Sequence, residues 1–358
     1  MQTAVIAVRA VALATAILAL AGCAGGSASA PPTTAPPSSA PPSTPPPTVV
    51  STEPTSRYGL DCADLVDEAL ALATVTVPVA AVDPLVTAAG VGTAIPRRTS
   101  IISQGGTVCE WSNGVPVNDQ YGSDPAYVGV VLSVLPRPAS GWSAKATQYG
   151  MPSNVSSCAA DLCVMSTVVG DAWVTLEASG GSAAVIDPVA ADALLADLVA
   201  TVTAAGAPTP LATPARTQPP LPSDCELVLP VASVRTITGD TGAVLSHGGG
   251  GWSDWAEARL NAANEGCRWA VGDENSATVG WIRDGRWAYD RAQAAGTFSP
   301  TTITGLGAGD EASIRCDAAF GTTCSVDIAL GPDWVNVAGN DEATAIELAE
   351  AVVARLTP

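Results

Sequence analysis

The sequence has few of the side chains on which most enzymes and nucleic-acid-binding proteins rely. Its 358 residues include one histidine, His247, and one lysine, Lys145. Acidic residues outnumber basic ones by 34 to 15, which gives a net charge of -19. Nucleic acids and acidic polymers are repelled by this charge, and no basic stripe offsets it. We interpret the negative charge as a means of staying soluble at a crowded surface.

Sequence motifs for catalysis and metal binding are also absent. No GxSxG, HExxH or P-loop pattern occurs, and no CxxC pair is present to hold zinc. His247 precedes glycines 248–251 with no cysteine or serine motif to serve, so we interpret it as a loop residue. The acidic loops 272–275 and 339–342 lack the ligand spacing of a calcium loop and suit turns and helix caps better. We therefore expect a non-enzymatic protein with no catalytic residues, no metal and no cofactor.

Long apolar runs are lacking outside the amino terminus, and no other stretch is expected to cross a membrane. Residues 1–23 combine a positive start at Arg9 with an apolar run over 10–21, shorter than the about 20 residues that span a bilayer. The string Leu20-Ala21-Gly22-Cys23 then fits a lipoprotein signal peptidase. We expect a signal peptide whose cleavage leaves Cys23 carrying a diacylglycerol thioether and an amino-terminal palmitate. Two or more chains anchor stably. The alternative is ordinary secretion, with Cys23 as a spare thiol.

Two proline-rich segments divide the rest of the chain. Residues 24–56 contain Pro, Ser, Thr, Ala and Gly with little charge, so we expect a disordered tether. In polyproline II form it reaches on the order of 100 Å, enough to lift the folded part into or through a cell wall. A similar stretch at 205–223 is expected to be a disordered linker. The remaining segments, 57–204 and 224–358, are each large enough for one hydrophobic core.

The other eight cysteines form two sets of four, which recur at a step of 158 to 163 residues. Tryptophans keep the same step, from Trp111 to Trp269 and from Trp173 to Trp334. The chain is therefore predicted to be a tandem repeat of one domain. The first set is Cys62, Cys109, Cys158 and Cys163, and the second is Cys225, Cys267, Cys316 and Cys324.

Outside the cytoplasm these cysteines are expected to pair. Four cysteines allow three connectivities, so spacing alone does not decide the pairing. We favour the first with the second and the third with the fourth, because the last two are close enough to join neighbouring strands. On the chain-entropy model a long bridge contributes about 4 kcal/mol and a short one about 2 kcal/mol. The predicted pairs are Cys62–Cys109, Cys158–Cys163, Cys225–Cys267 and Cys316–Cys324.

Local patterns predict an α+β fold for each copy, a mostly antiparallel sheet with helices packed on one face. Each copy opens with Asp-Cys, and a short helix is expected next in the first copy. Alternation around the second cysteine predicts strands, as do the runs 127–135 and 276–283. Later elements are short helices led by Trp142 and Trp287, hairpins turning at 170–171 and 331–333, and terminal amphipathic helices over 187–204 and 341–356.

Three elements carry a resemblance to a known group. They are the Asp-Cys opening, the strand Cys267-Arg268-Trp269 and the run Gly305-Leu306-Gly307-Ala308-Gly309-Asp310-Glu311-Ala312. They resemble the uncharacterised cysteine-containing surface lipoproteins of actinobacteria, which are similar to extracellular sensor domains of mycobacterial receptor kinases. The resemblance covers 224–358 best, because the first copy has 149–153 in place of the glycine-rich run. It implies a surface location and a binding or sensing role, and it supplies no catalytic residues.

Trp252 and Trp255 are the ligand candidates. They lie beside a glycine run and lack counterparts in the first copy, and WxxW at a helix start presents two indoles on one face, as sugar or peptide platforms do. The other interpretation is that tryptophans here belong to the core. Trp269, Trp287 and Trp334, which do have counterparts, are expected there.

These observations predict a lipid-anchored protein on the outer face of the cytoplasmic membrane, with tandem non-catalytic binding or sensing domains. A cell-wall glycan, a lipid, a peptide or an envelope protein is the expected partner, and nucleic acid is not. The first alternative is a structural or interaction component of the cell envelope. The second is an envelope hydrolase. A cleft in the second domain lined by Trp252 and Trp255 favours a binding protein, whereas smooth, filled domains favour a structural one.

Overall fold

The computed structural model describes residues 51–118, 124–136, 155–212, 214, 216, 219–246, 253–264, 266–317 and 323–357. These residues all fall in one compact unit of the chain, Pro46–Pro358. Cys23, His247 and Trp252 lie outside the described residues. The predicted leader, most of the predicted tether and the predicted helix at Trp142 lie outside them as well.

The first copy forms an antiparallel sheet with the strand order β1-β2-β3-β6-β5-β4. The strand β2 carries Cys109 and Trp111, and the predicted turn at Gly170 joins β5 to β6 with the positive φ of 56° that glycine adopts without strain. The strands are β1 Ala80–Val82, β2 Thr107–Ser112, β3 Gly129–Pro136, β4 Val155–Cys158, β5 Leu162–Val169 and β6 Ala172–Ser179.

The second copy forms an antiparallel sheet with the order β10-β11-β12-β13-β9-β8-β7. Apart from the additional edge strand β10, this is the order of the first sheet, with β7, β8, β9, β13, β12 and β11 in the places of β1, β2, β3, β6, β5 and β4. The predicted α+β fold with two antiparallel sheets is therefore confirmed. The strands are β7 Val244–Leu245, β8 Cys267–Val271, β9 Glu274–Ile282, β10 Ser299–Thr301, β11 Glu311–Cys316, β12 Cys324–Leu330 and β13 Asp333–Gly339.

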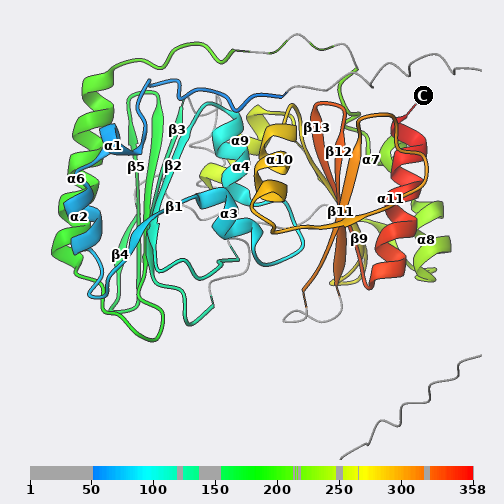
Figure 1. Ribbon diagram of the computed structural model, residues 1–358, viewed down its shortest axis with the longest axis horizontal. Coiled ribbons are helices and arrows are strands. Elements are labelled where there is room, and N and C mark those ends of the chain that lie inside the picture. Colours follow the sequence, from blue (N-terminus) through cyan, green and yellow to red (C-terminus); the bar gives the residue numbers. More distant parts are fainter. Residues whose placement is uncertain are drawn as a thin grey trace, which may run out of the picture. The chain divides into compact units, whose positions relative to one another are not determined.

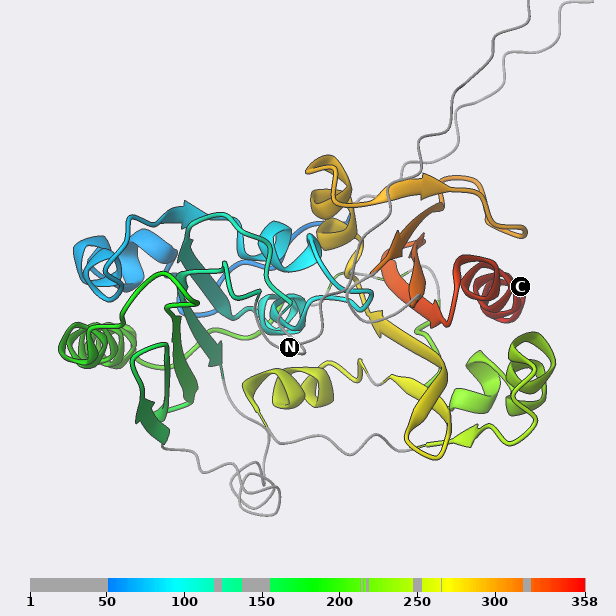
Figure 2. The same ribbon diagram turned by 90° about the horizontal axis from the view of Figure 1, so that it is seen from below.

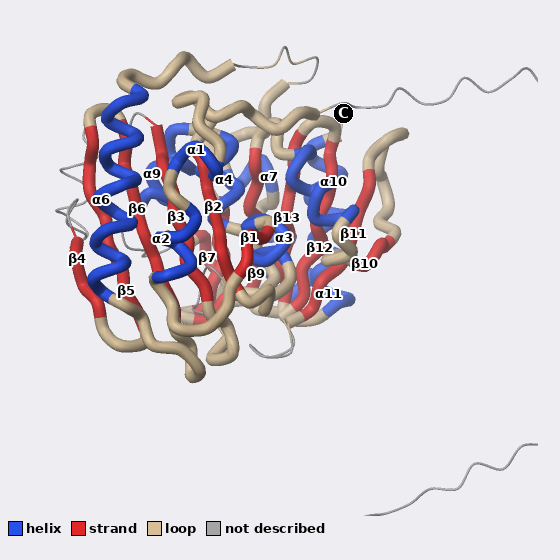
Figure 3. The backbone as a smooth tube through the Cα atoms, turned by 60° about the vertical axis from the view of Figure 1, so that its left-hand side comes forward, coloured by secondary structure: helices blue, strands red, loops and turns tan. Residues whose placement is uncertain are grey.

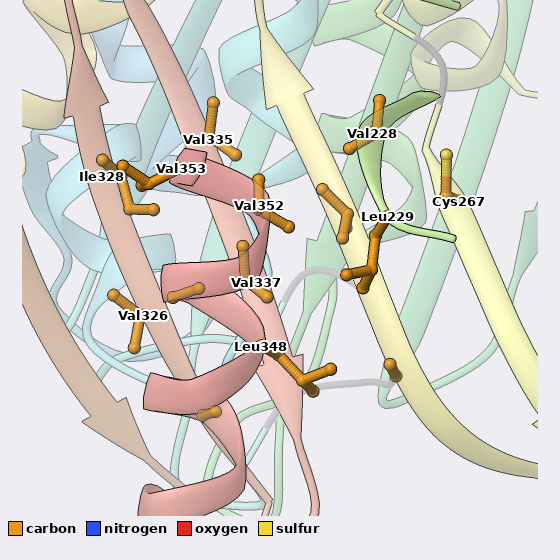
Figure 4. Close-up of a cluster of buried hydrophobic side chains, with 14 of the residues drawn as sticks. Val228, Leu229, Cys267, Val326, Ile328, Val335, Val337, Leu348, Val352 and Val353 are labelled. Carbon is orange, nitrogen blue, oxygen red and sulfur yellow. The ribbon is translucent and has the colours of Figure 1, made fainter. Parts of the chain in front are cut away.

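Each sheet packs one face on helices from its own copy (Figures 1 and 3). On the first sheet α6, Pro188–Ala205, buries Ala191, Leu194, Leu198 and Val202, which are spaced three or four residues apart along one side. On the second sheet α11, Glu342–Leu356, places Leu348, Val352 and Val353 against the valines of β12 and β13 and against Ile328 (Figure 4). The shorter helices of these outer layers are α1 Cys62–Leu65, α2 Glu68–Ala73, α7 Cys225–Val228 and α8 Val231–Thr238.

Among the described residues, α6 is the one helix long and apolar enough to cross a membrane by length and hydropathy. This finding corrects the expectation that no stretch outside the leader is apolar enough. The exposed side of α6 is rich in alanine, at Ala193, Ala196, Ala200 and Ala204. Alanine raises the mean hydropathy of the helix without adding large apolar side chains to its exposed side. Because Leu194 and Leu198 are buried against the sheet, we interpret α6 as a core helix of the first copy.

The opposite faces of the two sheets share a central layer of helices (Figures 1 and 2). This layer holds α3, Pro84–Ala89, and α4, Arg97–Ser103, from the first copy. The second copy contributes α9, Asp254–Asn261, and α10, Arg286–Ala294. The two copies thus have a hydrophobic cluster in common, which includes Leu85, Ile101, Leu135, Trp173, Trp287, Tyr289 and Trp334.

The eight cysteines of the two sets form four disulfides in the favoured pairs. Each long bridge joins the first helix of its copy to the second strand, and the Cα–Cα distance is 5.6 Å in both. Each short bridge joins two directly opposed residues of a hairpin, with 4.0 Å between the Cα atoms in both. The Asp-Cys opening has a structural role, because Asp61 and Asp224 cap these first helices through their carboxylates.

The described parts of the proline-rich segments form contacts with the first copy and with the second. Arg57 and Thr209, at the two ends of the first copy, exchange backbone and side-chain hydrogen bonds. Farther along, Arg216 forms ion pairs with Asp284 at 2.9 Å and Asp333 at 2.7 Å in the second copy. These contacts fix the path of the chain between the two copies at both ends.

Candidate functional site

A cavity of about 1120 Å³ opens on the central face of the second sheet. Its lining comes from β8, β9, β13 and α9 of the second copy and from residues 92–95 of the first. Ligand cavities in proteins are typically about 300–1,000 Å³, so this one has room for an extended ligand. The feature expected of a binding protein was a cleft in the second domain lined by Trp252 and Trp255; Trp255 lines this cavity, and Trp252 lies outside the described residues.

The floor of the cavity is the middle of β9 and β13. Because side chains alternate along a strand, Val279 and Trp281 point into the outer core, and Thr278 and Gly280 face the central layer. Gly280 lies opposite Asn336 in the register of the two strands. The cavity floor is therefore formed by small and polar residues of the sheet.

Neither the backbone nor the packing of the described residues requires a glycine at position 280. A Cβ atom built on Gly280 meets no atom of the described residues within 4 Å, and its φ is not among the positive values. Glycine inside a strand costs about 0.5–1 kcal/mol relative to alanine, so a central glycine normally marks a bend or the close approach of another group. Here the space above Gly280 belongs to the cavity. The residue pattern over 276–283 predicted this strand but gave no sign of a role for its glycine.

One wall of the cavity is a loop of the first copy, held by a buried ion pair of the second. Asp327 is fully buried and accepts hydrogen bonds from the Nε of Arg315 at 2.7 Å and the indole of Trp334 at 2.9 Å. Arg315 also donates to the carbonyl oxygens of Gly92 and Ala94, both at 3.2 Å.

Asn336 completes this network at the cavity floor. Its amide donates to the carbonyl of Thr93 at 2.8 Å and to Asp327 at 2.9 Å. Arg315, Trp334 and Asn336 thus all bind the central carboxylate, and Arg315 and Asn336 also bind the backbone of the 92–95 loop. Because the network is buried, the loop has a defined position at the cavity edge.

Trp255 lies on α9 and lines the cavity. The guanidinium of Arg97 lies over its ring, 4.6 Å from the centroid, and that of Arg259 lies 4.9 Å from it. Such cation–π contacts occupy the space over a ring that a stacked sugar needs. The structure therefore brings Trp255 to the candidate site, held by two arginines, while Trp252 lies outside the described residues.

The lining has a mixed polar character. It offers amides and hydroxyls beside charges of both signs, and Arg268 already donates to Asn275 and to the carbonyl of Asp273. Such a lining presents polar groups of several kinds without favouring one net charge. Lining side chains with polar groups include Asn118, Asp224, Arg259, Arg268, Glu274, Asn275, Thr278, Asp317, Thr323, Asn336 and Asn340.

The other residues singled out in the sequence are part of the core or stabilise turns. Trp269 and Trp334 are fully buried and Trp287 nearly so, which confirms their assignment to the core. In the glycine-rich run, Asp310 accepts hydrogen bonds from the backbone of Gly307 at 3.1 Å and Gly331 at 2.7 Å, so it ties two turns together. Among the residues that the structure describes, no cluster of His, Cys, Asp or Glu is arranged to hold a metal ion.

Two buried phenols, Tyr289 and Tyr127, take part in hydrogen bonds inside the protein. Burial raises the pKa of Tyr289 to about 12, and its hydroxyl shares a hydrogen bond of 2.8 Å with Ser313. Burial also raises the pKa of Tyr127, whose hydroxyl donates to the buried Glu110 at 3.0 Å. Both groups remain protonated at neutral pH and act as fixed donors within the protein.

No protein-family model, no curated protein and no solved structure matches this chain. The resemblance to actinobacterial surface lipoproteins therefore remains a hypothesis drawn from short motifs. The function has to be argued from the cavity and from the chemistry of the chain itself.

Proposed function

We propose that the chain is a lipid-anchored extracytoplasmic protein that binds a segment of envelope glycan in the cavity on its second sheet. The observation that carries the proposal is the cavity floor at Gly280, where neither the backbone nor the packing of the described residues requires a glycine. Four disulfides support an oxidising compartment, and the lipobox at Cys23 supports anchoring at the membrane.

The lining favours a glycan over the other candidate ligands. A lipid tail needs a continuous apolar lining, whereas amide, hydroxyl and charged side chains interrupt the apolar surface of this one. A strongly anionic ligand meets a protein of net charge -19. A neutral polyhydroxyl chain carries no charge to be repelled, can approach the backbone of β9 at Gly280, and is abundant where the protein is expected to reside.

Filling the floor is the direct test of this proposal. We expect Gly280→Val to weaken binding of soluble cell-wall glycan fragments by about tenfold or more, since overpacking a site costs about 1–3 kcal/mol. Valine favours a strand conformation, so the variant should remain folded. Binding is measured by isothermal titration calorimetry, and the melting temperature is recorded beside it.

The matched control is Ala81→Val, which adds bulk to an exposed strand position that is not part of the cavity lining. It should bind like the unmodified protein. If Gly280→Val is folded and binds the fragments as tightly as the unmodified chain, the cavity is not the site. If the unmodified chain binds none of the fragments, the glycan assignment is wrong.

A further inference from the structure

We infer that the two copies contact each other as the subunits of a two-fold symmetric dimer do. The central face of each copy is then a dimerisation surface, and its partner is the other copy. In an isologous interface residue i of one subunit contacts residue j of the other, and j contacts i. Positions near the axis contact their own equivalents. The inference does not depend on the proposed ligand.

Equivalent positions in the two copies follow from the strand registers. Trp173 pairs with Leu135 in the first sheet, and its counterpart Trp334 pairs with Ile282 in the second. Two residues farther along, Thr175 pairs with Ser133, and Asn336 pairs with Gly280. Thr175 is therefore equivalent to Asn336, and Ser133 to Gly280.

The first sign of two-fold symmetry is that equivalent helices pack on each other. The helix α4 ends six residues before Cys109, and α9 ends six residues before Cys267, so the two occupy the same place in the repeat. They pack together in the central layer. On this alignment Arg97 is equivalent to Trp255, and these two side chains are in contact, 4.6 Å from guanidinium to ring centroid.

The second sign is that equivalent sheet positions bind nearby parts of the opposite copy. In the first sheet Thr175 and Ser133 donate to the carboxylate of Asp254 at 3.2 and 2.6 Å, at the start of α9. In the second sheet Asn336 donates at 2.8 Å to the carbonyl of Thr93, just before α4. The first sheet thus binds the first residue of the central helix α9, and the second sheet binds the loop before the central helix α4.

The symmetry also accounts for the presence of one open floor. Where Asp254 lies on Ser133 and Thr175 in the first sheet, the equivalent site in the second sheet has the bare Gly280. The residue equivalent to Asp254 is Pro96, which has no side-chain group to reach that floor. After duplication, a symmetric pair of sites has become one closed contact and one cavity.

Exchanging the two equivalent residues tests the inference in the full-length chain. We expect Arg97→Trp and Trp255→Arg each to lower the urea midpoint of unfolding, because one creates an indole pair and the other a cluster of guanidiniums. We expect the double variant to recover more than half of the summed loss, because a symmetric interface offers the same surroundings to either arrangement. A double variant that loses the sum or more would overturn the inference.

Two further comparisons distinguish the effect of the symmetry from a general loss of folding. The exchange Asp83→Arg with Arg291→Asp reverses an ion pair of 2.5 Å that crosses the interface at positions that are not equivalent. Since Asp83 also caps α3, this exchange should recover nothing. In addition, Thr175→Asn, which installs the second-copy residue, should keep a higher midpoint than Thr175→Val. Equal losses for those two variants would contradict the inference.

Discussion

Replacing Cys23 with serine is expected to abolish acylation of the protein and to remove it from the detergent phase of a membrane extract. The lipobox cysteine supplies the only thiol outside the two sets of four, and a thioether does not form on a hydroxyl. Two or more acyl chains give stable anchoring, so their loss changes the distribution almost completely. The measurement is incorporation of labelled palmitate together with the intact mass of the amino-terminal peptide.

The matched control is Ser27→Ala, a substitution of similar size in the same segment that leaves the thiol in place. It should retain both the label and the detergent partitioning. If Cys23→Ser incorporates as much label as the control, the anchor is elsewhere and the lipoprotein proposal is wrong.

The largest loss of stability is expected for Asp327→Ala. This carboxylate is fully buried and accepts from Arg315, Trp334 and Asn336. Removing one partner of a buried ion pair leaves an uncompensated charge, which typically costs about 3 to 5 kcal/mol. The cost is read from the free energy of unfolding in urea. The loop at 92–95 should lose protection from hydrogen exchange in the same variant, because Arg315 and Asn336 no longer hold it.

The repeat itself provides the control for this variant. In the first copy the indole of Trp173 donates to Ser166 at 2.6 Å, the same contact that Trp334 makes with Asp327. No charge is involved there, so Ser166→Ala should cost only about 1 kcal/mol, the usual net value of one hydrogen bond. Equal costs for the two substitutions would show that the buried charge does not hold the interface.

Much of the fold could be predicted because its signals are local or repeated. The step between the cysteine sets indicated duplication, and the turn at 170–171 and the carboxylate caps at Asp187 and Asp341 indicated the hairpin and the terminal helices, which the structure places at Pro188–Ala205 and Glu342–Leu356. Each of these signals depends on neighbours in sequence, or on a comparison of one copy with the other.

The arrangement of the two copies could not be predicted in this way. Arg315 binds backbone carbonyls more than 200 residues away. Because every residue has a backbone carbonyl, the sequence does not show which one is bound. The role of Trp255 was incompletely predicted for a related reason. The WxxW pattern predicted that Trp255 presents an exposed indole to a ligand. Its ring is instead covered by Arg97 of the first copy, which is distant in the sequence. Long-range partners of this kind leave no local pattern.

Hydrogen exchange along a urea series tests most directly the claim that two copies of one disulfide-bonded module form a single body with a shared core. Peptides from β6 and β13 report on the first and the second copy separately. The account predicts that the slow amides of both strands become exposed at the same urea concentration, because the cluster around Trp173 and Trp334 unfolds as one. Loss of protection in one copy at a clearly lower concentration, with the other still protected, would contradict it.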